Sequence, residues 1–188
     1  PRASHHRCRI YQHFNALNSA TRLPIFAYNV PPRTIIDIQP GTMARIATLE
    51  HVIGVKDATC DLARPLTEHR LINNREFIFL SGEDPTAVAY NAHGGRGCIS
   101  VTANVAPGLC AQMQNACMQG DFGTALGIQR QLMPLHTALF KEPSPAGVKY
   151  ASSLLGLCHD ECRLPIVELT GDTKAQIKHA MTELELIG

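Results

Sequence analysis

Lys56 is the side chain in this sequence whose type and position most directly suggest chemistry. It follows the apolar run of residues 52–55, so we expect a strand that carries an amine into apolar surroundings. A lysine in water is almost fully protonated at pH 7, but burial favours the neutral form. A neutral amine attacks a ketone and forms an imine. The alternative is a lysine that extends from the strand end to water, which is the commoner situation.

Tyr28 favours the reactive interpretation of Lys56. It lies near the end of the apolar run of residues 23–30, one strand–helix repeat before the lysine. Strand side chains alternate between faces, so Lys56 shares a face with Gly54 and Ala58, which we expect to leave space beside the amine. A phenol both donates and accepts protons, as imine formation requires. The alternative is a core aromatic residue whose hydroxyl is hydrogen-bonded.

Three positions near the expected strand ends are candidates for substrate contacts. Arg33 lies in the loop beyond the strand of Tyr28, and a guanidinium there can bind a carboxylate through two hydrogen bonds. Taken alone, it is more simply an exposed loop arginine. Gly82 ends one expected strand and Ile99 opens the next, so their backbone groups could meet a small keto acid. Three acidic residues nearby are interpreted as solvated or structural: Asp57, Glu83 and Asp84.

Two other patterns carry less chemistry. Cys158-His159-x-x-Cys162 offers three candidate ligands and no second cluster that would complete a tetrahedral site, so we expect no metal. Residues 94–97, Gly-Gly-Arg-Gly, precede a strand rather than a helix and are interpreted as a turn, not a phosphate site. The 7 cysteines are scattered along the chain, which favours reduced thiols over a disulfide framework.

Strand and helix patterns alternate four times in the first part of the chain. Apolar runs predict strands over residues 23–30, 52–58, 77–82 and 98–103. Helical patterns precede or separate them at residues 10–17, 40–47, 62–72 and 87–92. Such alternation, with strands that are apolar throughout, predicts a parallel sheet covered by helices.

After residue 109 the strand patterns stop. Helices are predicted over residues 109–118, 122–140, 148–157 and 173–186, with a looser connection over 158–171. We therefore divide the chain into residues 1–118, with the βα repeats, and 119–188, a helical region. A complete eight-stranded barrel takes about 250 residues. The 188 residues predict either a small open α/β sheet or half of a barrel.

Composition excludes several classes of function. Hydrophobic residues make up 45% and charged residues 18%, as in ordinary globular proteins, and the formal net charge is +1. This charge gives no electrostatic signal for nucleic acid or an acidic membrane. We find no apolar run long enough to span a bilayer and no signal-peptide pattern. The expectation is a cytoplasmic protein without nucleic-acid or membrane partners.

Two segments of the chain resemble a known family. Residues 28–34 (Tyr-Asn-Val-Pro-Pro-Arg-Thr) and 53–59 (Ile-Gly-Val-Lys-Asp-Ala-Thr) resemble the signature strands of the dihydrodipicolinate synthase family. Its later segments are similar to residues 80–84, 94–105, 132–136, 142–145 and 148–149. The similarity runs from about Tyr11 to the end. It implies an α/β fold, the C-terminal half of a TIM (β/α)8 barrel with four βα units, followed by a C-terminal helical extension.

The resemblance also implies a reaction. Members are Schiff-base lyases of lysine biosynthesis that condense pyruvate with aspartate semialdehyde, use no metal or organic cofactor, and form homo-oligomers, usually tetramers. By the match, Lys56 forms the Schiff base with pyruvate and Tyr28 relays protons. Arg33 helps to bind the carboxylate of aspartate semialdehyde. The main chain at Ile99 contacts pyruvate, with Gly82 nearby.

The sequence also departs from the family pattern. The family's first four strands, which hold the paired threonines of the proton relay and most of the lysine feedback site, have no counterpart here. Residues 1–9 lack the tyrosine that the family contributes across a dimer. Three hypotheses stay open: an active synthase, a related pyruvate-dependent aldolase such as N-acetylneuraminate lyase or a keto-deoxy sugar acid aldolase, and an inactive half-barrel that only assembles. Arg33, in its place after Tyr28, favours the synthase over the second.

Overall fold

The computed structural model describes residues 2–74 and 76–188, with side chains in the first helix described from residue 8. Its packing divides the chain into two compact units, Pro1–Ile99 and Ser100–Gly188. We call these unit 1 and unit 2 and describe each by itself. The boundary predicted after residue 118, where the strand patterns stop, stays a prediction.

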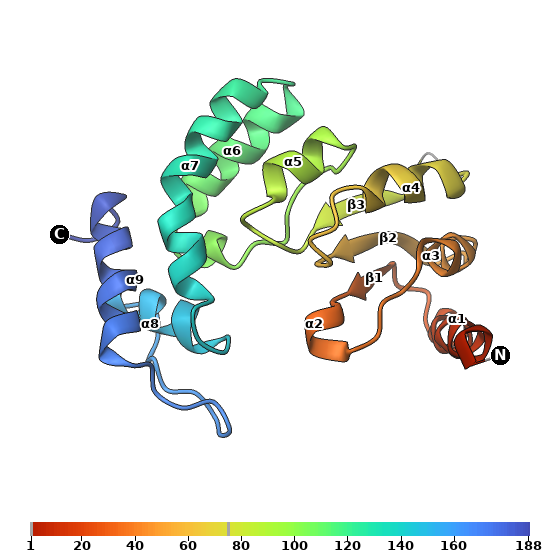
Figure 1. The fold of residues 1–188 in the computed structure, drawn as a ribbon, viewed down its shortest axis with the longest axis horizontal. Helices are drawn as coiled ribbons and strands as arrows, with labels where there is room; N and C mark the ends of the chain where they lie inside the picture. The colour runs from red at the N-terminus through yellow and green to blue at the C-terminus, as the bar shows by residue number, and fades with distance from the viewer. Residues whose placement is uncertain (1, 75) are drawn as a thin grey trace. The chain divides into compact units, whose positions relative to one another are not determined.

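The described residues of unit 1 form a three-stranded parallel sheet in the order β1-β2-β3 (Figure 1). The strands are β1 (Ile25–Asn29), β2 (Val52–Asp57) and β3 (Ile78–Ser81). Three of the predicted strands are therefore confirmed, each a little shorter than its apolar run. The register pairs Tyr28 with Lys56, and Lys56 with Leu80, across the sheet.

The fourth strand, predicted over residues 98–103, is wrong in its extent. Cys98 makes one isolated parallel bridge to Ser81. The chain then turns into a 3-10 helix, η1 (Thr102–Asn104). The Ser100 hydroxyl accepts a hydrogen bond from the Ala103 N–H at 2.9 Å. This local bond gives the backbone an alternative to a strand ladder, which the apolar pattern could not reveal.

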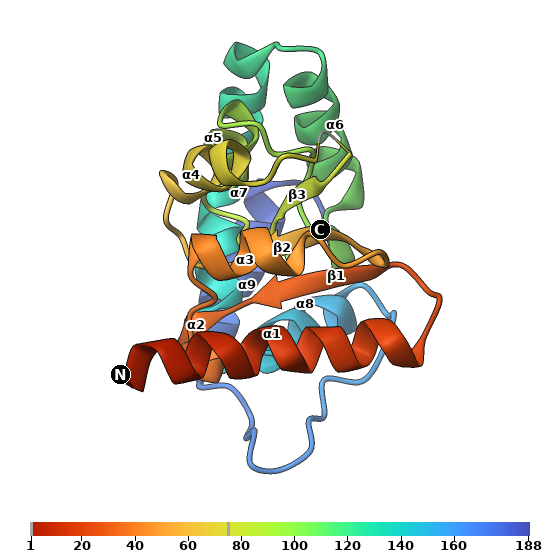
Figure 2. The ribbon, with the colours of Figure 1, turned by 90° about the vertical axis from the view of Figure 1, so that its right-hand side faces the viewer.

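Helices cover one face of the sheet. They are α1 (Arg2–Ala20), α3 (Pro40–Ile46), α4 (Arg64–Leu71) and α5 (Ala87–Ala92), and the short α2 (Pro31–Thr34) follows β1 directly. Figure 2 shows α1 along its length. The covered face carries Ala27, Val55 and Phe79, which pack with Met43 and Ile46 in one hydrophobic core. Strand side chains alternate, so the opposite face holds Tyr28 and Lys56.

Unit 2 is helical in its described residues. Its helices are α6 (Pro107–Met118), α7 (Phe122–Leu139), α8 (Ala146–Leu154) and α9 (Gly171–Glu183), close to the predicted ranges. Asp121 and Thr170 cap α7 and α9 by accepting backbone N–H groups from Thr124 and Thr173. A buried hydrogen bond of 2.7 Å joins Thr102 of η1 to His136 of α7. None of the helices formed by the described residues is long and apolar enough to cross a membrane.

Candidate active site

Lys56 and Tyr28 lie opposite each other on neighbouring strands and face the same side of the sheet. They are register partners in the parallel pair of β1 and β2. The Lys56 Nζ lies 4.1 Å from the centroid of the Tyr28 ring. The lysine is half-buried, and Tyr28 is 44% exposed. The structure thus brings the predicted amine and phenol together, in a setting more open than the apolar strand suggested.

The Lys56 amine has no carboxylate partner among the residues that the structure describes. Its described contact is the face of the Tyr28 ring. Ion pairs of the described lysines involve Lys141 and Lys174 instead. An aromatic face attracts an ammonium group less firmly than an adjacent carboxylate does. Within the described residues, the Lys56 amine is therefore not held in a salt bridge.

Gly82 lies against the Lys56 side chain. A Cβ atom at Gly82 would lie 3.0 Å from the Lys56 Cε and 3.1 Å from its Cγ. Its N–H donates to the Asp57 carbonyl at 2.6 Å, which holds this backbone close to β2. A side chain at this position would therefore require the Lys56 side chain to shift by a few tenths of an ångström.

Gly54 does not leave the open space that we expected beside the amine. A Cβ atom there would overlap the ring of Phe26, its register partner on β1, and would come 2.5 Å from the Ile78 carbonyl oxygen. The expectation is wrong because the aromatic side chain of the neighbouring strand fills the place. Ala58 is buried.

Ile99 and Arg33 lie near the carboxyl ends of β3 and β1. The Ile99 N–H donates to the Ser81 carbonyl at 2.8 Å, and its side chain is 45% exposed. Arg33 lies in α2 and is exposed. Within the described residues the Arg33 guanidinium forms no hydrogen bond or ion pair, so it is available to a carboxylate. Helix α2 ends at Thr34, and the next residue, Ile35, caps it with φ of 59°.

The other face of the sheet, at the adjacent register position, carries buried polar residues. Asn29 pairs with Asp57 in the register, and the two are 1% and 3% exposed. Burial raises the pKa of Asp57, although its carboxylate accepts the Thr59 N–H at 2.8 Å. Asp84 is also buried. Of the two interpretations given for Asp57 and Asp84, solvation is therefore wrong for both.

Arg64 of α4 forms the centre of this buried network. Its guanidinium bonds to the Asp37 carboxylate at 2.7 Å and to the Ile38 carbonyl at 2.9 Å. Glu68, one helical turn on, lies 3.7 Å from it and is fully buried. Burial raises the pKa of Glu68 to about 8; the charge of Asp57 adds to this and Arg64 opposes it. Burial also raises the pKa of the Tyr90 phenol.

Sequence reasoning missed this network, although a weak signal was present. Arg64 and Glu68 stand four residues apart, a spacing that places both on one face of a helix. Neither their burial nor the approach of Asp37 and Asn29 can be read from that spacing.

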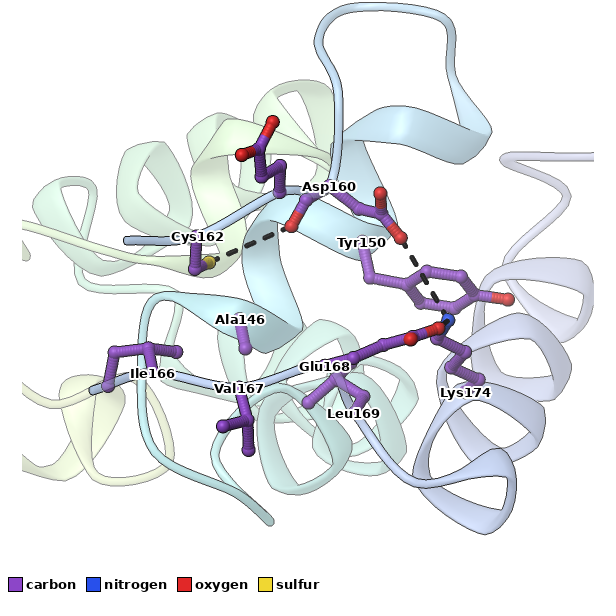
Figure 3. Close-up of a pocket in the computed structure, with 10 residues that line it drawn as sticks. Ala146, Tyr150, Asp160, Cys162, Ile166, Val167, Glu168, Leu169 and Lys174 are labelled. Carbon is purple, nitrogen blue, oxygen red and sulfur yellow. Dashed lines mark hydrogen bonds and ion pairs between the residues drawn. The ribbon is translucent and has the colours of Figure 1, made fainter. Parts of the chain in front are cut away.

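A second lysine–tyrosine pair lies in unit 2, beside a cavity of about 330 Å³ between α8, α9 and the loop before α9 (Figure 3). The Lys174 Nζ is 5.3 Å from the centroid of the Tyr150 ring. It also pairs with Glu168 and, at 3.9 Å, with Asp160. The hydrogen bond that Lys174 donates to Glu168 is the main cause that raises the pKa of Lys174. This amine is held in its charged form and is unsuited to nucleophilic attack.

Cysteine and histidine side chains form no metal centre that the structure can identify. Within residues 8–74 and 76–188, no group of three or more His, Cys, Asp or Glu side chains is placed to hold a metal ion. Cys158 and Cys162 are free thiols whose Sγ atoms donate to the carbonyls of Lys149 and Asp160.

A family model described as the dihydrodipicolinate synthetase family matches residues 5–184. The chain belongs to this family. It is 55% identical over 175 residues to the 4-hydroxy-tetrahydrodipicolinate synthase of Cereibacter sphaeroides, covering 93% of this chain and 60% of that protein. The synthase of Parvibaculum lavamentivorans is 53% identical over 178 residues, covering 95% and 61%. The chain therefore spans about 60% of the length of these relatives.

Solved structures of dihydrodipicolinate synthases have the same fold over this region. The enzyme from Thermotoga maritima aligns with a TM-score of 0.93 at 34% identity, covering 96% of this chain and 62% of that one. The enzyme from Aquifex aeolicus gives 0.93 at 31% identity, covering 96% and 61%. The predicted fold class, a C-terminal portion of a TIM barrel followed by helices, is confirmed.

Proposed function

We propose that this chain supplies the imine-forming residues of a 4-hydroxy-tetrahydrodipicolinate synthase, the lyase that condenses pyruvate with L-aspartate 4-semialdehyde in lysine biosynthesis. The observation that carries the proposal is the register pair of Lys56 and Tyr28, with the amine over the ring and no carboxylate of the described residues beside it. Family membership and the synthase names of the relatives support the choice of reaction.

In the proposed mechanism, the neutral Lys56 amine attacks the carbonyl carbon of pyruvate. The carbinolamine then loses water to give an imine, and the Tyr28 hydroxyl passes the protons that this exchange requires. Loss of a methyl proton turns the imine into an enamine, whose carbon attacks the aldehyde of the second substrate. The amino group of that substrate then attacks the imine carbon, closes the ring and releases Lys56.

Three further residues would bind the substrates. The exposed guanidinium of Arg33 would hold the carboxylate of aspartate semialdehyde through two hydrogen bonds. The N–H groups of Gly82 and Ile99 already donate to Asp57 and Ser81. Contacts of these two residues with pyruvate would therefore use their carbonyl groups and surfaces rather than their N–H groups.

The direct test is reductive trapping in the intact protein. Pyruvate and sodium borohydride are added together, and peptide mass spectrometry locates the reduced adduct. We expect the adduct on Lys56, no adduct in Lys56→Ala, and a normal adduct in Lys174→Ala, the matched lysine beside Tyr150. An adduct on another residue, or no adduct at all, would contradict the proposal that Lys56 forms the imine.

The alternative reaction, cleavage of N-acetylneuraminate or of keto-deoxy sugar acids, uses the same lysine imine. The two reactions are distinguished by comparing kcat/KM for such sugars with kcat/KM for aspartate semialdehyde. We expect the value for the semialdehyde to be higher. A homo-oligomer, dimer or tetramer, and a cytoplasmic location are parts of the same proposal. Light scattering of the intact protein tests the first, and cell fractionation tests the second.

A further inference from the structure

The position of Tyr28 depends on how the end of β1 is held against β2. A register shift interrupts the pairing between Ile25 and Phe26, so the start of the strand does not fix its later part. Among the described residues β1 pairs with β2 alone. In the described residues, the pairing of Phe26–Asn29 with β2 therefore holds Tyr28 opposite Lys56 from one side, and further contacts at the end of β1 would add to that hold.

Asn29, the residue after Tyr28, is clamped on the covered face of the sheet. Its side-chain amide donates to Asp37 at 2.9 Å and accepts the Ile38 N–H at 3.1 Å. Its backbone carbonyl accepts the Ala58 N–H at 2.9 Å, which extends the pairing with β2 by one step. Because these bonds hold the backbone at Asn29, they also hold the preceding residue.

Arg64 holds both residues that clamp Asn29. Its side chain is 7% exposed, and its guanidinium donates to the Asp37 carboxylate and to the Ile38 carbonyl. The guanidinium is planar and presents its N–H groups in a fixed fork, so it fixes the direction of both contacts as well as their distance. The segment of residues 37–38 is thereby held between α4 and the end of β1.

We propose that Arg64 is a positioning residue for the Tyr28–Lys56 pair. It acts through Asp37, Ile38 and Asn29 to hold the end of β1 in register with β2. The inference rests on the proposed function, because it assigns Arg64 to the geometry of that reaction. Proton transfer and imine formation depend steeply on the distance between the reacting groups, so loosening this clamp slows the chemistry before it prevents folding.

The test compares Arg64→Gln, Arg64→Lys and a matched control in the intact protein. The control is Arg45→Gln, an arginine of α3 that lies over the Tyr11 ring and not in this network. For the fraction shown to be folded by circular dichroism, we measure the single-turnover rate of borohydride-trappable imine formation and the KM for pyruvate. We expect the rate to fall by about 30-fold in Arg64→Gln. Arg64→Lys should recover part of the loss, Arg45→Gln should match the wild type, and KM should change by less than about threefold.

A folded Arg64→Gln protein that forms the imine at the wild-type rate would overturn the inference. If that variant does not fold, Asp37→Asn replaces it. This change keeps an acceptor for Asn29 and weakens the bond to Arg64, so a smaller loss of rate in the same direction is expected. An unchanged rate in Asp37→Asn would then overturn the inference.

Amide hydrogen exchange separates this inference from the proposed reaction. The N–H groups of Ala58 and Ile38 report whether Asn29 is held. Both should exchange at least about tenfold faster in Arg64→Gln than in Arg45→Gln, whether or not pyruvate is trapped. If the wild type traps no pyruvate on Lys56, the proposed function fails by itself, and equal exchange in the two variants is what overturns the positioning role.

Discussion

The two lysine–tyrosine pairs of this molecule use the same residue types for opposite purposes. In unit 1 the Lys56 Nζ lies 4.1 Å from the centroid of the Tyr28 ring and has no ion-pair partner among the described residues. In unit 2 the Lys174 Nζ lies 5.3 Å from the centroid of the Tyr150 ring and pairs with carboxylates as well. The comparison teaches that an aromatic neighbour does not by itself identify a reactive amine.

The acids near each pair account for the difference. Glu168 faces Lys174, and the hydrogen bond from the lysine lowers the pKa of this carboxylate. In unit 1 the acids Asp57, on the covered face of the sheet, and Glu68, in α4, are buried, and burial raises the pKa of each. One lysine is held charged by solvated carboxylates, and the other is separated from its acidic neighbours by the sheet itself.

The largest expected effect tests whether the acids of unit 1 are buried in the way described. Glu68 has an ordinary pKa of 4.5, which burial raises to about 8 in the fold. Between these values the folded state holds a proton on Glu68 that the unfolded state lacks. The contribution of this group to the free energy of unfolding is therefore fully present below pH 4.5 and is lost as the pH rises through 8. Relative to Glu68→Gln, the free energy of unfolding of the wild type should fall by about 1.4 kcal/mol per pH unit, or about 4 kcal/mol from pH 5 to pH 8.

Urea denaturation at each pH measures this difference. The groups that face Glu68 are Asp57, Arg64 and Asp37, with the Tyr90 phenol nearby, and all are kept in the variant. The control is Glu76→Gln, at an exposed position. Parallel stability curves for the wild type and Glu68→Gln would contradict the prediction.

Removing the hydroxyl of Tyr28 tests whether this residue transfers protons in the reaction. Tyr28→Phe keeps the aromatic face over the Lys56 amine and removes the proton relay. We expect turnover to fall by about a hundredfold, the usual scale of lost acid–base assistance. Tyr150→Phe makes the same change in unit 2 and should leave turnover as it is. Equal turnover in the two variants would show that the Tyr28 hydroxyl does not relay protons in the reaction.

Placing a carboxylate beside Lys56 should make the Lys56–Tyr28 pair resemble the Lys174–Tyr150 pair, in which the amine is held in its charged form. Leu80 is the register partner of Lys56 on β3. A nearby carboxylate raises the pKa of an amine by one to three units. Leu80→Glu should therefore slow reductive trapping of pyruvate at pH 7 by about 30-fold. Leu80→Gln is the uncharged control, and the charge explanation is lost if it slows trapping as much.

The smallest effect concerns the space beside the lysine. Gly82→Ala would place a Cβ atom 3.0 Å from the Lys56 Cε, so the lysine side chain would have to shift by a few tenths of an ångström. We expect the trapping rate to fall by about tenfold, since a small displacement of a reacting group is costly. Gly41→Ala adds a methyl group where nothing lies within 4 Å and should change little. A wild-type trapping rate in Gly82→Ala would show that the Lys56 side chain can shift without slowing imine formation.

The differences between pattern and structure have particular causes. The strand predicted over residues 98–103 is reduced to a single bridge at Cys98. The Ser100 hydroxyl accepts a hydrogen bond from the Ala103 N–H, which favours a local turn over a strand. Gly54 was expected to leave a space, but Phe26 of the next strand fills it. In both cases the outcome depends on a specific contact, and the pattern records only whether each residue is apolar or polar.

The sequence alone determined the repeat of strand and helix and the face on which Lys56 lies. Apolar runs of this length form buried strands, and a parallel sheet brings equivalent positions of successive repeats together, so the neighbourhood of Tyr28 and Lys56 could be predicted. Only the tertiary structure decided that Lys56 has no acidic partner in the described part of the chain. It also decided that Asn29, Asp37, Arg64 and Glu68 form one network. These contacts join residues far apart in the chain, and their energies depend on burial and distance, which no local pattern of residue types contains.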